Sequence, residues 1–120
     1  MNVENLYNYC LSIYGAEATT PFGDNALVMK VCGKMFALIP LDAERLSISL
    51  KCDPELALEL RGKYASVEGA YHMNKKHWNM IYIDGEMGDE EIKKWIRHSV
   101  DEVIKKLSKS KQKEYYESME

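Results

Sequence analysis

The sequence predicts an α+β fold of two layers, in which helices pack on an antiparallel β-sheet of about five strands. Two observations lead to this prediction. Apolar residues recur at three- and four-residue steps near both ends of the chain, as in amphipathic helices, whereas short apolar runs bounded by turn residues fill the middle. The middle runs follow one another with short connections, which join antiparallel strands. The expected order is helix, four strands, helix, strand, helix.

The N-terminal part is expected to hold one helix and one edge strand. Apolar side chains at helical spacing extend from Val3 to Tyr14, and Gly15 follows at once as a natural end of the helix. Residues 16–20 contain two Thr and are expected to form a short strand. The next residues, Pro-Phe-Gly-Asp-Asn at 21–25, favour a turn because Pro fixes φ, while Gly and Asn tolerate positive φ.

Three further strands are expected to form a meander. Residues 26–32 and 34–39 are apolar and of strand length, and Gly33 between them predicts a tight hairpin. In residues 46–51 three aliphatic side chains alternate with polar ones, which indicates a strand with one buried face and one face in water.

A second helix and another strand are expected to follow. Asp53 and Pro54 make a favourable helix start, an N-cap acceptor before a proline at the first helical position. Residues 65–70 form either a connection or a weak strand, and residues 77–83 are predicted to form a strand that Asp84 and the glycine after it close.

A long final helix is predicted to begin near Gly88 and to bury one apolar face. Its opposite side faces water and carries Lys93, Lys94, Arg97, His98 and Asp101. The chain is expected to divide into a domain of residues 1–107 and a polar, frayed helical extension of residues 108–120.

Composition argues against several classes of protein. The chain of 120 residues carries 16 Lys and Arg against 19 Asp and Glu, a formal charge of −3, which is the wrong sign for a protein whose whole surface grips nucleic acid. No apolar stretch approaches the roughly 20 residues of a membrane helix, and the N-terminus lacks the basic start of a secretory signal. The three cysteines lack Cys-x-x-Cys spacing. We expect them to be reduced and largely buried in a cytoplasmic protein without membrane contact.

No catalytic or cofactor-binding constellation is predicted. The seven glycines are scattered and form neither of the usual phosphate-binding glycine motifs. His72, His77 and His98 share no face at metal-ligand spacing. The acidic residues between Asp84 and Glu91 coincide with a turn and a helix start, where the helix dipole favours anions. We therefore expect a non-enzymatic protein without cofactor or metal.

The stretch with the most unusual composition is residues 71–79, Tyr-His-Met-Asn-Lys-Lys-His-Trp-Asn. Cations beside aromatic faces are the groups that contact phosphates and stack on bases. In the alternative interpretation, Tyr71 and Trp78 pack into the sheet while Lys75 and Lys76 face water in a loop. A second basic run either solvates the end of the chain or serves as a phosphate-contacting arm; it comprises Lys105, Lys106, Lys109, Lys111 and Lys113.

Four segments occur in order along the chain: Pro-Phe-Gly at 21–23, Val-Cys-Gly-Lys-Met-Phe-Ala at 31–37, Leu-Lys-Cys-Asp-Pro at 50–54 and the stretch at 71–79. Together with the closing helix that carries Ser99, they make the chain resemble the MmcQ/YjbR family over about residues 2–107. The resemblance implies a two-layer α+β domain, similar to frataxin-like and secretion-chaperone-like arrangements. It also implies a DNA-binding label, which rests on likeness to the double wing of a phage transcription factor. It supplies no catalytic residues.

Two functional hypotheses follow, and both assume a monomer. The first is a domain that contacts double-stranded DNA, with the candidate residues Lys34, Lys51, His72, Asn74, Lys75, Lys76, His77, Trp78 and Asn79. The second is a protein- or peptide-binding module of the secretion-chaperone type, for which eight tyrosines in an acidic chain are suitable. An enzyme or a metal carrier ranks third, on the frataxin-like analogy and the acidic residues at 84–91. The first hypothesis requires the lysines to gather on one exposed face.

Overall fold

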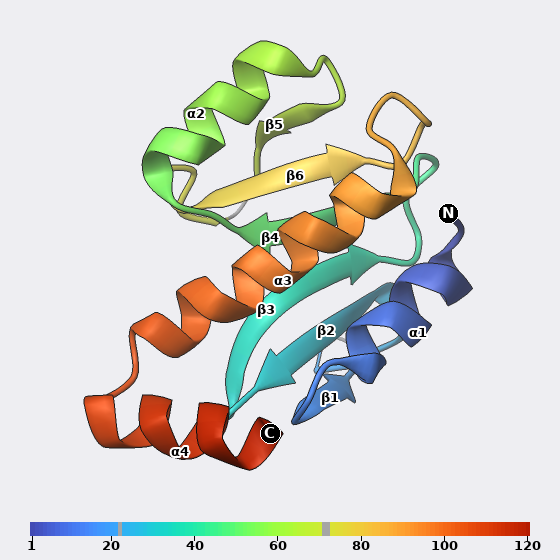
Figure 1. Cartoon of the computed structure of the whole chain (residues 1–120). Coiled ribbons are helices and arrows are strands. Elements are labelled where there is room, and N and C mark those ends of the chain that lie inside the picture. The colour runs from blue at the N-terminus through green and yellow to red at the C-terminus, as the bar shows by residue number, and fades with distance from the viewer. Residues whose placement is uncertain (22, 71–72) are drawn as a thin grey trace.

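The computed structural model describes residues 1–21, 23–70 and 73–120 and confirms an α+β fold built on an antiparallel sheet (Figure 1). In the described residues the six strands lie in the order β1-β2-β3-β4-β6-β5, and each neighbouring pair is antiparallel. The elements are α1 (Val3–Ser12), β1 (Ala16–Thr19), the 3-10 turn η1 (Gly23–Asn25), β2 (Ala26–Val31), β3 (Lys34–Pro40), β4 (Ser47–Lys51), α2 (Pro54–Lys63), β5 (Val67–Gly69), β6 (Trp78–Tyr82), α3 (Asp89–Lys105) and α4 (Lys109–Met119).

The predicted hairpin joins β2 to β3. Val31 pairs with Lys34, so Cys32 and Gly33 alone form the turn. Both have positive φ, 51° and 75° respectively, which is the pair of conformations that a type I′ turn requires. Glycine adopts this conformation without strain, and its twist matches that of the two strands.

The segment that could be a connection or a weak strand is β5, which pairs with β6 and makes the sheet one strand wider than expected. Val67 is buried, and backbone hydrogen bonds from Ala70 to Trp78 and from Tyr82 to Ser66 extend the pairing. Gly69 lets the Lys75 side chain pack closely over it: a Cβ there would lie 3.2 Å from that side chain, which would have to shift slightly. β5 is therefore stabilised by tertiary contacts rather than by local preference.

Helices α1 and α3 cover one face of the sheet (Figure 1), and α2 adds Ala57 and Leu60 to the same core. The core side chains of the sheet include Met29, Ile39, Ile48, Leu50 and Ile81, and those of α1 and α3 include Leu6, Cys10, Ile92, Ile96 and Val100. Within the described ranges, no helix is long and apolar enough to cross a lipid bilayer.

A bulge interrupts β3 at Phe36, because Ala37 pairs with Met29 while Met35 pairs with Lys30. The hydroxyl of Ser99 on α3 bridges β3 and β4 just beyond the Ala37–Leu50 pair, where the ladder between these two strands ends. Its Oγ accepts a hydrogen bond from the Lys51 N–H at 2.9 Å and donates one to the Phe36 carbonyl at 2.6 Å. Ser99 thus fixes the height of α3 over the sheet and the end of β4.

The C-terminal extension is docked rather than frayed. Tyr115 is buried, its hydroxyl donates a hydrogen bond to the Tyr14 carbonyl at 2.8 Å, and its ring lies 5.5 Å from the Tyr14 ring. Ser108 caps the start of α4 by accepting a hydrogen bond from the Lys111 N–H. One aromatic anchor and one cap therefore hold a helix whose other side chains are largely polar.

We expect Tyr115→Phe to lower the free energy of unfolding by about 1 kcal/mol, because the ring stays packed while a partly buried hydrogen bond is lost. Urea denaturation measures the change. Tyr116→Phe is the matched control, since the Tyr116 hydroxyl contacts the exposed carboxylate of Asp101, and its effect should stay within about 0.5 kcal/mol. Equal effects of the two substitutions would contradict the anchoring role of Tyr115.

Candidate functional site

The strand register brings two of the predicted lysine groups to one end of the sheet. Lys51, the last residue of β4, pairs with Trp78, the first residue of β6. The next residue, Cys52, donates its N–H to the His77 carbonyl at 2.7 Å. The loop that carries Lys75 and Lys76 therefore ends beside the last residue of β4. The two lysines lie three and two residues before Trp78, the partner of Lys51.

Asn74 shapes this loop. Its side-chain oxygen accepts a hydrogen bond from the Lys76 N–H at 3.0 Å, and its carbonyl accepts one from the His77 N–H at 3.0 Å. This is the local turn chemistry that asparagine commonly supplies. Lys75 and Lys76 are exposed as a result, whereas His77 and Trp78 are half-buried.

Arg61 of α2 ties the loop to the body of the domain. Its Nε donates a hydrogen bond to Asn79 Oδ1 at 2.7 Å, and a terminal nitrogen contacts the carbonyls of Lys75 and, at 3.4 Å, Trp78. Sequence reasoning missed Arg61, because an arginine near the end of a helix looks like an ordinary surface charge. Its only sequence signal is a position on the same helix as the buried Ala57 and Leu60.

Asn79 is not a surface contact, which corrects its assignment as a nucleic-acid ligand. It is 1% exposed, and its amide also donates a hydrogen bond to the Ala57 carbonyl at 3.1 Å. A buried amide with both ends engaged cannot reach a phosphate. The candidate His72 lies outside the described residues, as does Tyr71.

The C-terminal end of α3 adds a further cation beside Lys51. Partial burial lowers the pKa of the Lys51 ammonium, the neighbouring Lys106 lowers it further, and Glu102 opposes both effects. Lys51 and Lys106 therefore lie close enough to repel each other, and Glu102 partly offsets their charge. We call Lys51, Lys75, Lys76 and Lys106 the basic end.

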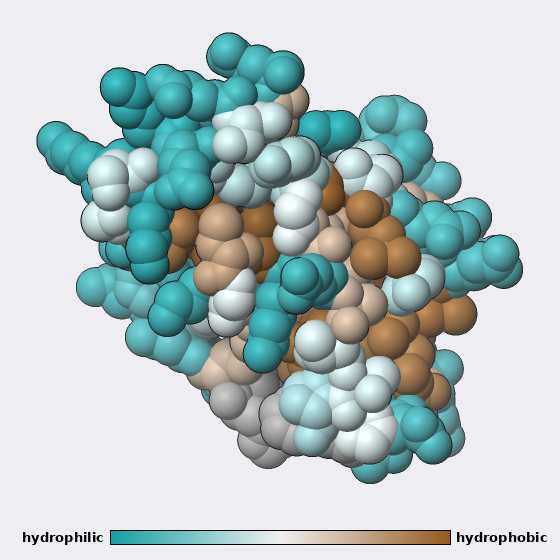
Figure 2. All heavy atoms as spheres, turned by 90° about the horizontal axis from the view of Figure 1, so that it is seen from below, coloured by the Kyte–Doolittle hydropathy of each residue, from teal (hydrophilic) through white to brown (hydrophobic). Residues whose placement is uncertain are grey.

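Lys34 belongs to a different surface. It begins β3 at the same end of the sheet, but it lines a hollow between the β2–β3 hairpin and α4, together with Cys32, Lys111 and Tyr115. Figure 2, seen from below, shows this side of the molecule, where hydrophilic side chains surround smaller hydrophobic areas. The predicted lysines therefore divide between two surfaces.

Two of the acidic residues at 84–91, Glu86 and Glu91, have structural partners elsewhere in the chain. Glu86 accepts hydrogen bonds from the N–H groups of Ala65 and Ser66 at 3.3 and 2.7 Å. Glu91 accepts one from the Tyr64 hydroxyl at 2.5 Å and one from the indole N–H of Trp95 at 3.2 Å. Across the part of the chain that the structure describes, no group of three His, Cys, Asp or Glu side chains could hold a metal ion.

Two of the three cysteines are buried, and burial raises the pKa of the Cys10 and Cys52 thiols to about 12. Cys32, in the hairpin turn, is exposed, which corrects the expectation for this residue. His98 also differs from expectation. It is half-buried rather than turned to water, and its Nε2 accepts a hydrogen bond from the Asp53 N–H at 3.1 Å.

Relatives of known sequence or structure share this architecture. The chain is 33% identical to protein YjbR of Escherichia coli strain K12 over 94% of this chain and 96% of that protein, and 34% identical to protein YbdF of Escherichia coli O157:H7 over 92% and 90%. The crystal structure of Deinococcus radiodurans protein DR2400, which holds a DUF419 domain, superposes with a TM-score of 0.87 at 37% identity over 95% of this chain and 87% of that one. A crystal structure of a Pseudomonas syringae protein superposes with a TM-score of 0.72 at 29% identity, over 82% of this chain and 96% of that one.

The YjbR family model matches residues 11–101, which run from the last turn of α1 through most of α3 and include the bulge, the Arg61 contacts and the loop of the basic end. With this match and the relatives above, the chain belongs to the YjbR family.

Proposed function

We propose that this chain is a monomeric, cytoplasmic, non-enzymatic domain that contacts the phosphates of double-stranded DNA through its basic end. The observation that supports the proposal most is the pairing of Lys51 with Trp78, which gathers cations from β4, the loop before β6 and the end of α3. Lysines next to a half-buried indole suit contact with a phosphate backbone.

The distribution of charge supports a local rather than a general attraction. β6 begins beside Lys51 and ends at Tyr82, so the acids that follow it, among them Asp84 and Glu86, lie at the opposite end of the sheet. A chain with a net charge of −3 would then approach DNA with its basic end first. Binding should weaken as salt concentration rises, because each lysine that contacts a phosphate displaces a counterion. For four lysines, we expect the logarithm of the association constant to fall against the logarithm of the salt concentration with a slope of about −3 to −4.

Fluorescence anisotropy of a labelled duplex, titrated at several salt concentrations, tests the proposal. We expect Lys75→Ala/Lys76→Ala to weaken binding about tenfold at low salt and to reduce the salt slope by about 2. Lys63→Ala/Lys94→Ala is the matched control, because it removes the same charge from lysines that lie near Glu91, away from the basic end.

Two results would overturn the proposal. One is a wild-type protein that does not bind duplex at low salt. The other is an equal loss of affinity in the two double variants, which would mean that overall charge rather than the basic end attracts DNA. Circular dichroism of each variant confirms that the fold is retained.

A protein- or peptide-binding module is the second candidate. It is favoured by an apolar hollow where α1 meets β2 and the residue after β3, lined by Val3, Tyr7, Leu27 and Leu41. A pull-down from nuclease-treated lysate separates the two candidates. A protein partner would remain bound after the treatment, whereas partners held through nucleic acid would be lost.

A further inference from the structure

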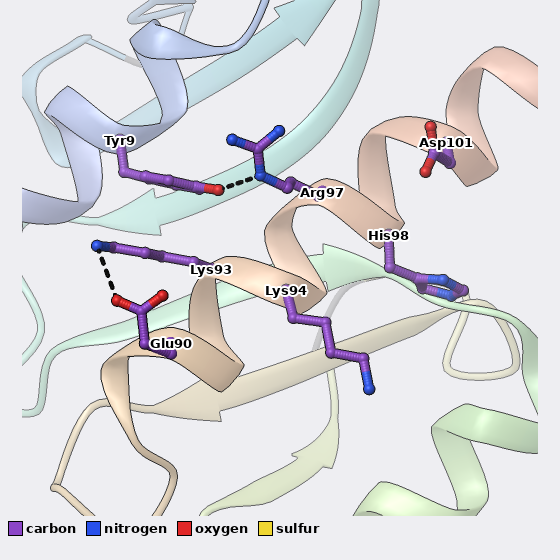
Figure 3. Close-up of a pocket in the computed structure, with 7 residues that line it drawn as sticks. All are labelled: Tyr9, Glu90, Lys93, Lys94, Arg97, His98 and Asp101. Carbon is purple, nitrogen blue, oxygen red and sulfur yellow. Dashed lines mark hydrogen bonds and ion pairs between the residues drawn. The ribbon is translucent and has the colours of Figure 1, made fainter.

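A second group of cations lies away from the basic end, in a shallow hollow between α1 and the outward side of α3 (Figure 3). The hollow has a volume of about 470 Å³ and is lined by Tyr9, Glu90, Lys93, Lys94, Arg97, His98 and Asp101. These are largely the residues that the sequence predicts for the solvent side of the last helix, and Tyr9 comes from the first helix.

Tyr9 holds two cations of α3 in place. The Lys93 ammonium and the Arg97 guanidinium each lie 5.4 Å from the centre of its ring, within the range of cation–π attraction. The Arg97 Nε also donates a hydrogen bond to the Tyr9 hydroxyl. Figure 3 shows that this contact leaves the two terminal nitrogens of Arg97 pointing away from the hydroxyl. The guanidinium is therefore oriented before any ligand arrives.

The fold brings these cations together against their mutual repulsion. Lys93 and Arg97 are one helical turn apart, a spacing at which like charges destabilise a helix. Lys93 pairs with Glu90 at 3.5 Å, but the Glu90 side chain is 91% exposed, so this ion pair is weak and easily exchanged. Asp101 accepts a hydrogen bond from Tyr116 of α4 at 2.8 Å. Among the described residues, the terminal nitrogens of Arg97 have no acidic partner within ion-pair distance.

We propose that this hollow binds the phosphate of a small phosphomonoester, with Arg97 and Lys93 as its ligands. A guanidinium presents two N–H groups in the geometry of two phosphate oxygens. Lys93 supplies a second positive charge, because its ammonium can leave the exposed Glu90 carboxylate and bind the phosphate instead. Lys94 points away from Tyr9 in Figure 3 and its ammonium lies 5.0 Å from the centre of the Trp95 ring, while His98 is engaged with Asp53, so neither is assigned to the phosphate. The inference is independent of DNA binding by the basic end.

Amide and Arg side-chain NMR spectra, recorded while inorganic phosphate replaces chloride at constant ionic strength, test this proposal. We expect saturable shifts at Arg97 Nε–H and at the α3 amides around Lys93, with a Kd on the order of millimolar. Arg97→Gln should weaken binding at least about tenfold, because it removes both the positive charge and the paired N–H donors of the guanidinium. Arg97→Lys keeps the positive charge but lacks the paired N–H donors of the guanidinium, so it should also weaken binding.

Controls separate this site from general charge. Lys63→Ala removes one positive charge elsewhere and should leave the phosphate titration unchanged. Tyr9→Phe keeps the ring but loses the hydroxyl, so it should weaken binding while the fold persists. Phenyl phosphate, a monoester, should bind more tightly than dimethyl phosphate, a diester. Equal binding of the two esters, unsaturable shifts, or wild-type affinity in Arg97→Gln would each overturn the proposal.

Discussion

Ser99→Ala is expected to lower the free energy of unfolding by about 2–4 kcal/mol, although it removes a single oxygen atom. The hydroxyl is fully buried and bridges β3 and β4 next to the Ala37–Leu50 pair, where their ladder ends. Without it, the Lys51 N–H and the Phe36 carbonyl both lose their partner. Each buried unsatisfied group costs about 1–3 kcal/mol, because water cannot reach it.

Ser66→Ala is the matched control for this prediction. Ser66 is also buried, at 2% exposure, but its hydroxyl makes no well-formed hydrogen bond within the described part of the chain; it only lies near Glu86, whose pKa it helps to lower. Its removal should therefore cost less than about 1 kcal/mol. Urea denaturation of both variants at one pH gives the two changes directly. If Ser99→Ala proved no more destabilising than Ser66→Ala, the bridging role of Ser99 between β3 and β4 would have to be abandoned.

Features with a local physical cause could be predicted from the sequence. The turn at Gly33 depends on a residue that tolerates positive φ. The alternation in residues 46–51 correctly predicted a strand, but the expectation that its polar face lies in water was wrong, because Ser47 and Ser49 are only 2% and 4% exposed. The apolar spacing of the last helix likewise placed Ile92, Ile96 and Val100 in the core. β5 could not be assigned in this way, because its three residues, one of them glycine, form a strand only through pairing with β6.

The candidate site was predictable only in part, for a similar reason. Lys75 and Lys76 are adjacent in sequence, so their grouping is visible at once, whereas their proximity to Lys51 depends on the register between β4 and β6. Trp78 and Asn79 are adjacent in a predicted strand and so lie on opposite faces of it, but the sequence does not say which face is covered. That choice depends on the position of α2, which is a tertiary contact.

A neighbouring position shows how stability and the proposed function can be separated. Asn79→Ala is expected to lower the free energy of unfolding by about 2 kcal/mol, because it removes the buried amide that accepts a hydrogen bond from the Arg61 Nε and donates a further hydrogen bond to the Ala57 carbonyl of α2. Arg61 would then hold the loop of Lys75 and Lys76 less firmly. Amide hydrogen exchange at His77, whose N–H bonds within the loop, should accelerate more than exchange in α3.

Asn74→Ala supplies the comparison, because Asn74 is exposed and its side chain bonds only to the Lys76 N–H among the described residues. It should cost less than about 1 kcal/mol while loosening the same loop. A direct role of Asn79 in DNA contact requires the opposite pattern, lower affinity for duplex with unchanged stability. Asn79→Ala removes a buried amide, whereas Asn74→Ala removes an exposed one. For each variant, the loss of unfolding free energy is compared with the loss of affinity for duplex. A residue that supports the fold mainly loses stability, and a residue that contacts DNA mainly loses affinity.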